Sequence, residues 1–208
     1  MRIDSAGVPF IAAALTFGLV LGVAGLWALA LPCVVLGGFF VFFFRDPDRH
    51  SPPVEEAVLS PADGRVLVAG PAVDGAAPPG SWQQVSIFLS PMDVHVNRIP
   101  VTGRVTRVAF QRGTFLPAYR PDAATRNERC EVWIDHTGQT IIARQVVGVL
   151  ARRVVCRVTS GTEVRAGDRF GIMKFGSRMD VFVPPSASIQ VKVSEVVRGG
   201  ETIIAVLH

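Results

Sequence analysis

The segment CEVWIDHTGQTIIARQVV, residues 130–147, decides the fold class. Residues 130–135 and 140–147 are rich in β-branched and apolar side chains, and Thr137-Gly138 lies between them. Short runs of this kind, bounded by turn residues, are typical of β-strands. The segment therefore predicts two strands joined by a turn.

The same pattern continues from residue 58 to the C-terminus. Further candidate strands are residues 64–69, 83–89, 103–111, 154–158, 169–175, 179–183, 188–191 and 202–206. No segment longer than ten residues in this part has a convincing helical period. Residues 115–128 contain few strand formers, so we expect a loop that covers a site. The sequence predicts one mostly β domain over residues 58–208, of the β-sandwich or barrel type.

The N-terminal part has a different composition, because residues 8–44 contain no charged side chain. As one helix this segment would be about 55 Å long, whereas the hydrocarbon core of a membrane is about 30 Å thick. We therefore expect a membrane-associated helical hairpin over residues 1–44. Its arms are predicted at 8–24 and 30–44, with Gly25 and Pro32 bracketing the turn. A cleaved signal peptide is the alternative, but the apolar run continues too far beyond Ala28-Leu29-Ala30.

Residues 45–57 are rich in proline and charge and are predicted to form a linker. The flanking arginines Arg2, Arg45 and Arg49 place both ends of the hairpin on the cytoplasmic face of the cell membrane, although aspartates beside them weaken this signal.

The overall composition follows from this division. The 208 residues are 49% hydrophobic and only 18% charged, whereas soluble domains carry about 25% charge. This composition excludes three classes of protein: a wholly soluble protein, a disordered protein and a small protein stabilised by disulfides. The net charge of +4 lies after residue 44, and such a basic domain is attracted to anionic lipid. We expect no nucleic-acid partner and no metal, because no corresponding motif is present.

Two motifs in the first half of the β domain carry polar residues. The motif SPADG, residues 60–64, suits a β-turn and contains Asp63. The motif SPMDVHVNRIP, residues 90–100, follows a predicted strand. His95 within it is in a setting typical of general acid–base chemistry, and a structural histidine is the alternative.

A third motif, GIMKFGSRMDV, spans residues 171–181 and contains Gly176-Ser177. This pair lies between two strand-like runs, whereas the other Gly-Ser pair, Gly80-Ser81, lies in a proline-rich turn. A glycine at this place permits a strained peptide whose carbonyl the serine hydroxyl could approach. The alternative is an ordinary turn serine.

Together, the hairpin and the three motifs resemble phosphatidylserine decarboxylase in its short bacterial proenzyme form. The resemblance covers almost the whole chain, and the order and spacing of the motifs make it specific. It departs from longer relatives in one place. Those have a second histidine three residues after the first, where this chain has Arg98. His95 must therefore serve both maturation and decarboxylation, or another group must take one of these tasks.

The resemblance implies a covalent pyruvoyl cofactor made from Ser177. Attack of the Ser177 hydroxyl on the Gly176 carbonyl, followed by β-elimination, would give a β chain, 1–176, and an α chain, 177–208, which stay together as a heterodimer. The pyruvoyl carbonyl would form a Schiff base with membrane phosphatidylserine, and loss of CO₂ would yield phosphatidylethanolamine. His95 and Asp63 are the implied catalytic partners of Ser177.

Three cations near the motifs, Arg98, Lys174 and Arg178, could contact the lipid phosphate, although solvated or structural roles are equally open. Two other functions remain open. One is a pyruvoyl-dependent decarboxylase of a soluble amino acid, which would not need a membrane hairpin. The other is a membrane-anchored β adaptor without enzymatic activity, for which Ser177 would be dispensable.

Overall fold

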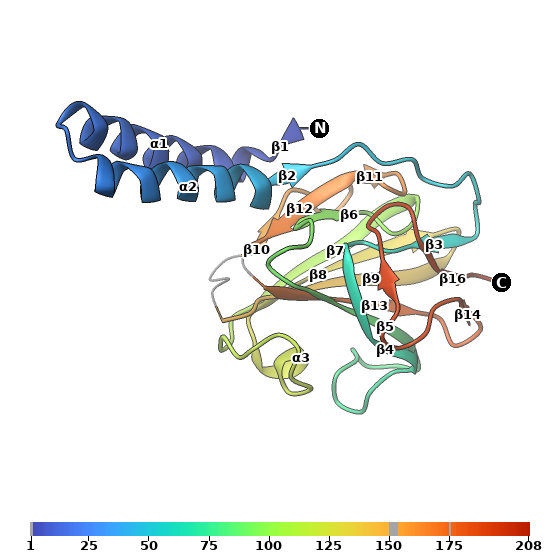
Figure 1. Cartoon of the computed structure of the whole chain (residues 1–208). Coiled ribbons are helices and arrows are strands. Elements are labelled where there is room, and N and C mark those ends of the chain that lie inside the picture. The colour runs from blue at the N-terminus through green and yellow to red at the C-terminus, as the bar shows by residue number, and fades with distance from the viewer. Residues whose placement is uncertain (1, 150–153, 175) are drawn as a thin grey trace. The chain divides into compact units, whose positions relative to one another are not determined.

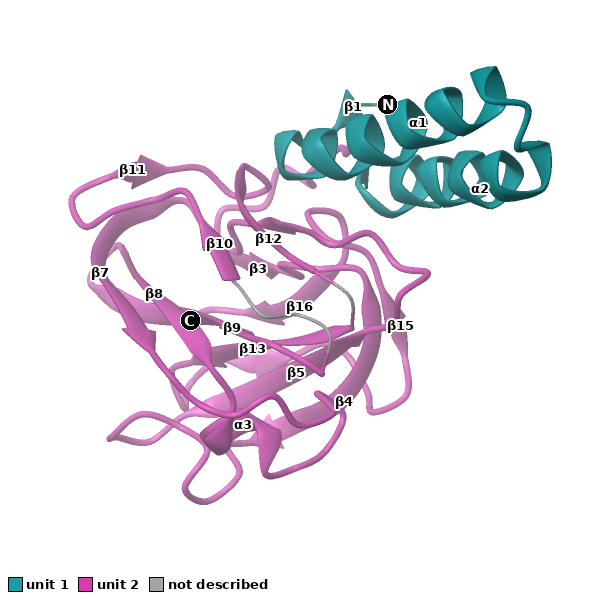
Figure 2. Ribbon diagram, turned by 90° about the vertical axis from the view of Figure 1, so that its left-hand side faces the viewer, with its two compact units in different colours: residues 1–48 teal, residues 49–208 magenta. Residues whose placement is uncertain are grey.

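The computed structural model describes residues 2–149, 154–174 and 176–208. The chain divides into two compact units, Met1–Asp48 and Arg49–His208 (Figure 2). The first is helical and the second consists mainly of strands (Figure 1). The predicted fold class, a mostly β domain preceded by an apolar helical hairpin, is confirmed.

The first unit is a helical hairpin closed at its base by a short ribbon. Its elements are β1 (Arg2–Ile3), η1 (Ser5–Gly7), α1 (Val8–Val23), α2 (Trp27–Phe43) and β2 (Arg45–Asp46). Strands β1 and β2 pair in antiparallel fashion, so Arg45 and Asp46 belong to this unit although they begin the predicted linker. The prediction that Pro32 borders the turn of the hairpin was wrong. The turn is shorter than predicted, and Pro32 lies inside α2, where an apolar helix tolerates it.

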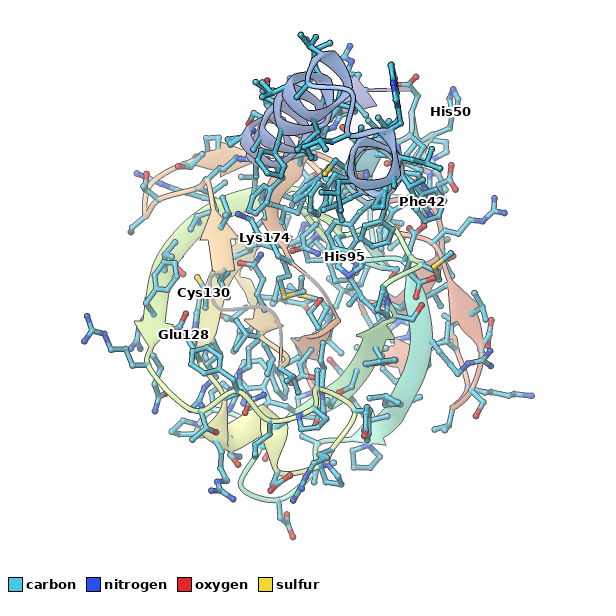
Figure 3. The ribbon with its side chains drawn as sticks, turned by 60° about the vertical axis from the view of Figure 1, so that its left-hand side comes forward. Phe42, His50, His95, Glu128, Cys130 and Lys174 are labelled. Carbon is cyan, nitrogen blue, oxygen red and sulfur yellow. The ribbon has the colours of Figure 1, made fainter. Side chains whose placement is uncertain are left out.

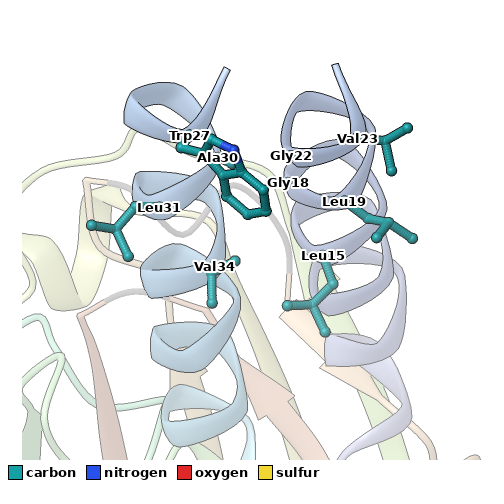
Figure 4. A pocket seen from close by; sticks show the side chains of 9 residues that line it. All are labelled: Leu15, Gly18, Leu19, Gly22, Val23, Trp27, Ala30, Leu31 and Val34. Atoms are coloured by element: carbon teal, nitrogen blue, oxygen red, sulfur yellow. The ribbon is translucent and has the colours of Figure 1, made fainter. Parts of the chain in front are cut away.

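The two helices of the first unit leave an apolar groove between them, with a volume of about 700 Å³ (Figure 4). Its lining residues are Leu15, Gly18, Leu19, Gly22, Val23, Trp27, Ala30, Leu31 and Val34. The helical segment Ser5–Val23 is long and apolar enough to cross a membrane, whereas Trp27–Phe43 has 17 residues. Most side chains of the longer segment are exposed, unlike those of a helix in a soluble core. These features suit a lipid environment.

The second unit contains fourteen strands and one short helix among the described residues. They are β3 (Ala57–Leu59), β4 (Gly64–Pro71), β5 (Gln83–Leu89), β6 (Val96–Arg98), β7 (Gly103–Gln111), α3 (Ala123–Arg126), β8 (Arg129–His136), β9 (Gln139–Val146), β10 (Val154–Cys156), β11 (Glu163–Val164), β12 (Arg169–Met173), β13 (Ser177–Val183), β14 (Ser188–Ile189), β15 (Val196–Val197) and β16 (Ile203–Val206).

Eight of these strands form a curled sheet in the order β11-β7-β8-β9-β13-β5-β4-β15 (Figure 2). Two three-stranded sheets, β10-β12-β6 and β14-β16-β3, complete the unit. Strand β13 is central in the large sheet, and all seven of its residues are buried. Alternate residues of β13, such as Met179 and Val181, join the main hydrophobic core. Residues of its other face, Arg178 and Asp180, form an ion pair of 2.6 Å.

The structure differs from the sequence prediction mainly in the short strands. Strands β3, β6, β11 and β15 have two or three residues each, and pairing with distant segments rather than local composition forms them. Strand β13 begins at Ser177, two residues before the predicted strand. The predicted strand 169–175 is observed as β12 up to Met173, and Phe175 lies outside the described residues.

Candidate active site

Ser177 is the first residue of the central strand β13 and is completely buried. It pairs with Leu89 of β5, and its neighbour Arg178 pairs with Val146 of β9. Among the described residues, the Oγ atom of Ser177 has no hydrogen-bond partner. A buried hydroxyl without a partner costs about 1–3 kcal/mol of stability. A hydroxyl that is buried but not hydrogen-bonded fits a nucleophile for a neighbouring carbonyl.

The peptide before Ser177 has an unusual backbone. Gly176 has a φ of +69°, which L side chains rarely adopt. Its carbonyl oxygen lies against Gly148, so closely that a Cβ atom at Gly148 would be 2.0 Å from it. Glycine at residue 148 is therefore required for the observed position of the Gly176 carbonyl, the group that the Ser177 hydroxyl would attack.

His95 lies immediately before strand β6 and is completely buried (labelled in Figure 3). Its Nδ1 atom is 2.9 Å from the carbonyl oxygen of Asp93. A carbonyl can only accept, so Nδ1 carries the proton and Nε2 of the neutral ring is the acceptor. The Gly176 N–H donates a long hydrogen bond of 3.4 Å to that Nε2 atom. The structure thus brings a basic nitrogen to the backbone N–H of Gly176, the residue before Ser177.

The side chain of Asp63 is hydrogen-bonded to Arg49 and Gly199 and not to His95 in the described part of the chain. Its carboxylate accepts from Arg49 at 2.7 Å and from the Gly199 N–H at 2.7 Å. Burial raises the pKa of the Asp63 carboxyl above its usual range, although the bonds from Gly199 and Arg49 lower it and the charge of Asp93 raises it slightly. The carbonyl of Asp93, not the side chain of Asp63, orients the imidazole of His95 in the described part of the chain. A catalytic role of Asp63 stays a prediction.

The three cations predicted to contact a phosphate lie in different surroundings. Arg98 is buried and donates to the Gly167 carbonyl at 3.0 Å. Arg178 is also buried, and beside its ion pair it donates to Ser86 Oγ at 2.9 Å. Lys174 follows strand β12 and is partly exposed (Figure 3). Phosphate binding by these residues stays a prediction, and Lys174 is the only one of the three whose side chain reaches the surface.

The family model described as "Phosphatidylserine decarboxylase" matches residues 36–205. The chain belongs to the phosphatidylserine decarboxylase family. The family resemblance inferred from the motifs is therefore confirmed.

Individual relatives extend this similarity over the whole chain. Three of them, each named "Phosphatidylserine decarboxylase proenzyme", come from Salinibacter ruber, Chlorobium limicola and Geobacter metallireducens. Their identities are 41%, 44% and 38%, over 87%, 80% and 99% of this chain and 82%, 78% and 96% of the respective relative. The match to the Geobacter metallireducens protein thus includes the helical hairpin.

Two further polar residues at the site were not predicted to have a role there. Asn97 lies within the motif of residues 90–100, whereas Gln145 lies outside all three motifs. Gln145 donates from Nε2 to Asn97 Oδ1 at 2.8 Å, and both residues are completely buried. Gln145 pairs with Met179, two residues along β13 from Ser177, so its side chain lies on the same face of the sheet as that of Ser177. Asn97 Nδ2 and Gln145 Oε1 have no partner among the described residues. This pair joins β6, which directly follows His95, to the strands beside Ser177.

Replacement of Gly148 by alanine is expected to slow any cleavage between Gly176 and Ser177 by about 10²-fold, because misplacement of a reacting group by about 1 Å has effects of this size. The new Cβ atom would collide with the Gly176 carbonyl oxygen and displace it. Gel electrophoresis of the protein over time measures the cleaved fraction. Gly38→Ala is the control, because a Cβ atom at Gly38 meets no atom within 4 Å. Equal cleavage of both variants would show that the carbonyl position is not critical.

Proposed function

We propose that this chain is a proenzyme that cuts itself between Gly176 and Ser177 and then decarboxylates phosphatidylserine to phosphatidylethanolamine. The buried, unpartnered hydroxyl of Ser177 beside a glycine peptide of positive φ is the observation that carries the proposal. Membership in the phosphatidylserine decarboxylase family supports the reaction, and the relatives' name "proenzyme" supports the processing.

The cleavage begins with His95. Its Nε2 atom takes the proton of the Ser177 hydroxyl, and Oγ forms a bond to the Gly176 carbonyl carbon. The peptide C–N bond then breaks, and the nitrogen of residue 177 receives the proton from His95, which leaves an ester. A base removes the α-proton of residue 177, and the Cβ–Oγ bond breaks. Gly176 leaves as a carboxylate, and residue 177 becomes an enamine.

The enamine of residue 177 tautomerises to an imine, which takes up one water molecule and releases ammonia. The product is a pyruvoyl group at the start of the α chain. Such a group supplies a carbonyl that condenses with the substrate amine and draws electrons from the bond to the carboxylate. The residues of this chain bury the reacting centre, and His95 is the proposed donor of the proton that replaces CO₂.

The two chains, 1–176 and 177–208, are proposed to remain together after the cut. The α chain would consist of strands β13 to β16. Strand β13 is hydrogen-bonded between β5 and β9, and β16 pairs with β3. The partner strands β3, β5 and β9 all belong to the β chain. These ladders and the shared core keep the α chain in place without a covalent link.

The proposed location is the cytoplasmic face of the cell membrane. The apolar helix Ser5–Val23 and the uncharged hairpin support membrane attachment. The arginines that flank the hairpin support the cytoplasmic face. An enzyme anchored in this way meets its lipid substrate within the bilayer.

Mass spectrometry of the intact, purified protein tests the proposal. We expect two chains of about 19 and 3 kDa, estimated from their lengths. Their masses should sum to that of the uncut chain plus one water and minus one ammonia. The smaller chain should lack a primary amine at its first residue. A single chain of 22.3 kDa that decarboxylates phosphatidylserine would overturn the proposed cofactor.

A further inference from the structure

Five large apolar side chains are exposed at one end of the β domain, and we call them the apolar rim. They are Met92, Phe110, Phe115, Tyr119 and Val149, with exposed fractions of 63%, 61%, 39%, 60% and 53%. Within the described part of Arg49–His208, the three exposed aromatic residues all belong to this rim. Exposed apolar side chains that gather in one place mark an interaction surface.

The strand register places the rim at the Ser177 end of the large sheet. One row of paired residues crosses five neighbouring strands: Gln111, Arg129, Val146, Arg178 and Phe88. Beyond this row, three segments connect the strand ends to the next parts of the chain. They are residues 90–95 after β5, 112–128 between β7 and β8, and 147–149 after β9. These three segments and the end of β7 carry the five rim side chains. The rim therefore surrounds the end of the sheet at which Ser177 begins β13.

The longest rim segment, 112–128, is fixed to the site rather than loosely attached. Asn127 donates from Nδ2 to the carbonyls of Leu116 and Val147, at 2.8 Å each. The ring of Tyr119 packs edge-on against Phe88, with 5.9 Å between the ring centroids. This anchoring holds the apolar side chains outward on an ordered surface, which is suited to insertion into an apolar phase.

The charges beside the rim favour an anionic lipid surface as the partner. Arg112, Arg120 and Arg126 are exposed on the same segment, and Asp122 compensates part of this charge through its ion pairs with Arg120 and Arg126. Aromatic and basic side chains together are typical of proteins that lie at the boundary between lipid headgroups and acyl chains.

We propose that the apolar rim inserts into the surface of an anionic phospholipid bilayer and brings the Ser177 end of the sheet to the lipid headgroups. This inference rests on the proposed function, because it assumes that the substrate of Ser177 is a lipid held in the bilayer. The hairpin attaches the chain to the membrane, whereas the rim orients the β domain on it.

The test compares two substrates on the full-length, cleaved enzyme. One is a phosphatidylserine with acyl chains short enough to dissolve as monomers, and the other is long-chain phosphatidylserine in vesicles. Tyr119→Asp should reduce kcat/KM on vesicles by about tenfold, since a charge in the apolar layer weakens interfacial binding. It should leave kcat/KM on the dissolved lipid unchanged. Phe110→Asp, on a different segment, should have the same effect.

Val73→Asp is the matched control, because Val73 is 45% exposed and lies beyond Pro71, at the opposite end of β4. Equal losses on both substrates, or no loss for either rim variant, would overturn the proposal. A loss accompanied by a change in oligomeric state in detergent would also overturn it, in favour of a second copy of the chain on the rim. Lack of activity of the unaltered enzyme on both substrates would instead refute the proposed function.

Discussion

Replacement of Ser177 by alanine is expected to leave the chain uncut and without decarboxylase activity. Alanine has no hydroxyl to attack the Gly176 carbonyl, so neither the ester nor the elimination that follows can form. The fold should be retained. The Ser177 hydroxyl is buried without a partner, so its removal is expected to raise the free energy of unfolding by about 1 kcal/mol. Electrophoresis, a phosphatidylserine assay and thermal unfolding of the same sample measure the three effects.

Ser81→Ala is the matched control for this variant. Ser81 also follows a glycine with positive φ, but it is exposed and lies in the turn before β5. This variant should be cut and active like the unaltered protein. If Ser177→Ala were cut at the normal rate, the nucleophile would have to be another residue. If it were uncut but fully active, a pyruvoyl group made from Ser177 would not be the source of activity.

The sequence contains enough information for the main strands and for the cleavage motif. The strand predicted over 103–111 is β7 with the same bounds, because the β-branched residues Val105, Thr106 and Val108 and the nearby Gly113 specify it locally. The pair Gly176-Ser177 could be recognised only together with the motifs at residues 60–64 and 90–100, because their order and spacing make the family resemblance specific. The signal for the strand thus consists of neighbouring residues, whereas the signal for the cleavage site comes from three separate motifs.

Other parts of the candidate site depend on contacts between distant segments and leave no such signal. Gly148 is required only because the carbonyl of Gly176, 28 residues later, lies against it. The ring of His95 is oriented by the backbone carbonyl of Asp93, and any residue type supplies a carbonyl. The sequence prediction therefore paired His95 with the carboxylate of Asp63, but Asp63 is bound by Arg49 and Gly199, which lie outside its motif.

Replacement of His95 by glutamine is expected to slow the cleavage by about 10²–10⁴-fold, the range in which a positioned acid or base contributes. A glutamine amide can accept the Gly176 N–H but cannot take a proton from the Ser177 hydroxyl. His136→Gln is the control, because His136 Nδ1 also contacts a backbone carbonyl, that of Thr102 at 2.7 Å, but at the opposite end of β8. Cleavage of His95→Gln at the normal rate would show that another group activates Ser177.

The same variant separates maturation from turnover. Since Arg98 stands three residues after His95, and Arg98 Nη1 donates to the Gly167 carbonyl, His95 is the proposed proton carrier for both steps. After prolonged incubation, the fraction of His95→Gln that has been cut can be quantified, and its decarboxylation rate expressed per α chain. We expect this rate to fall by a factor similar to that of the cleavage. A normal rate per α chain would assign the protonation step to a different residue and leave His95 with maturation alone.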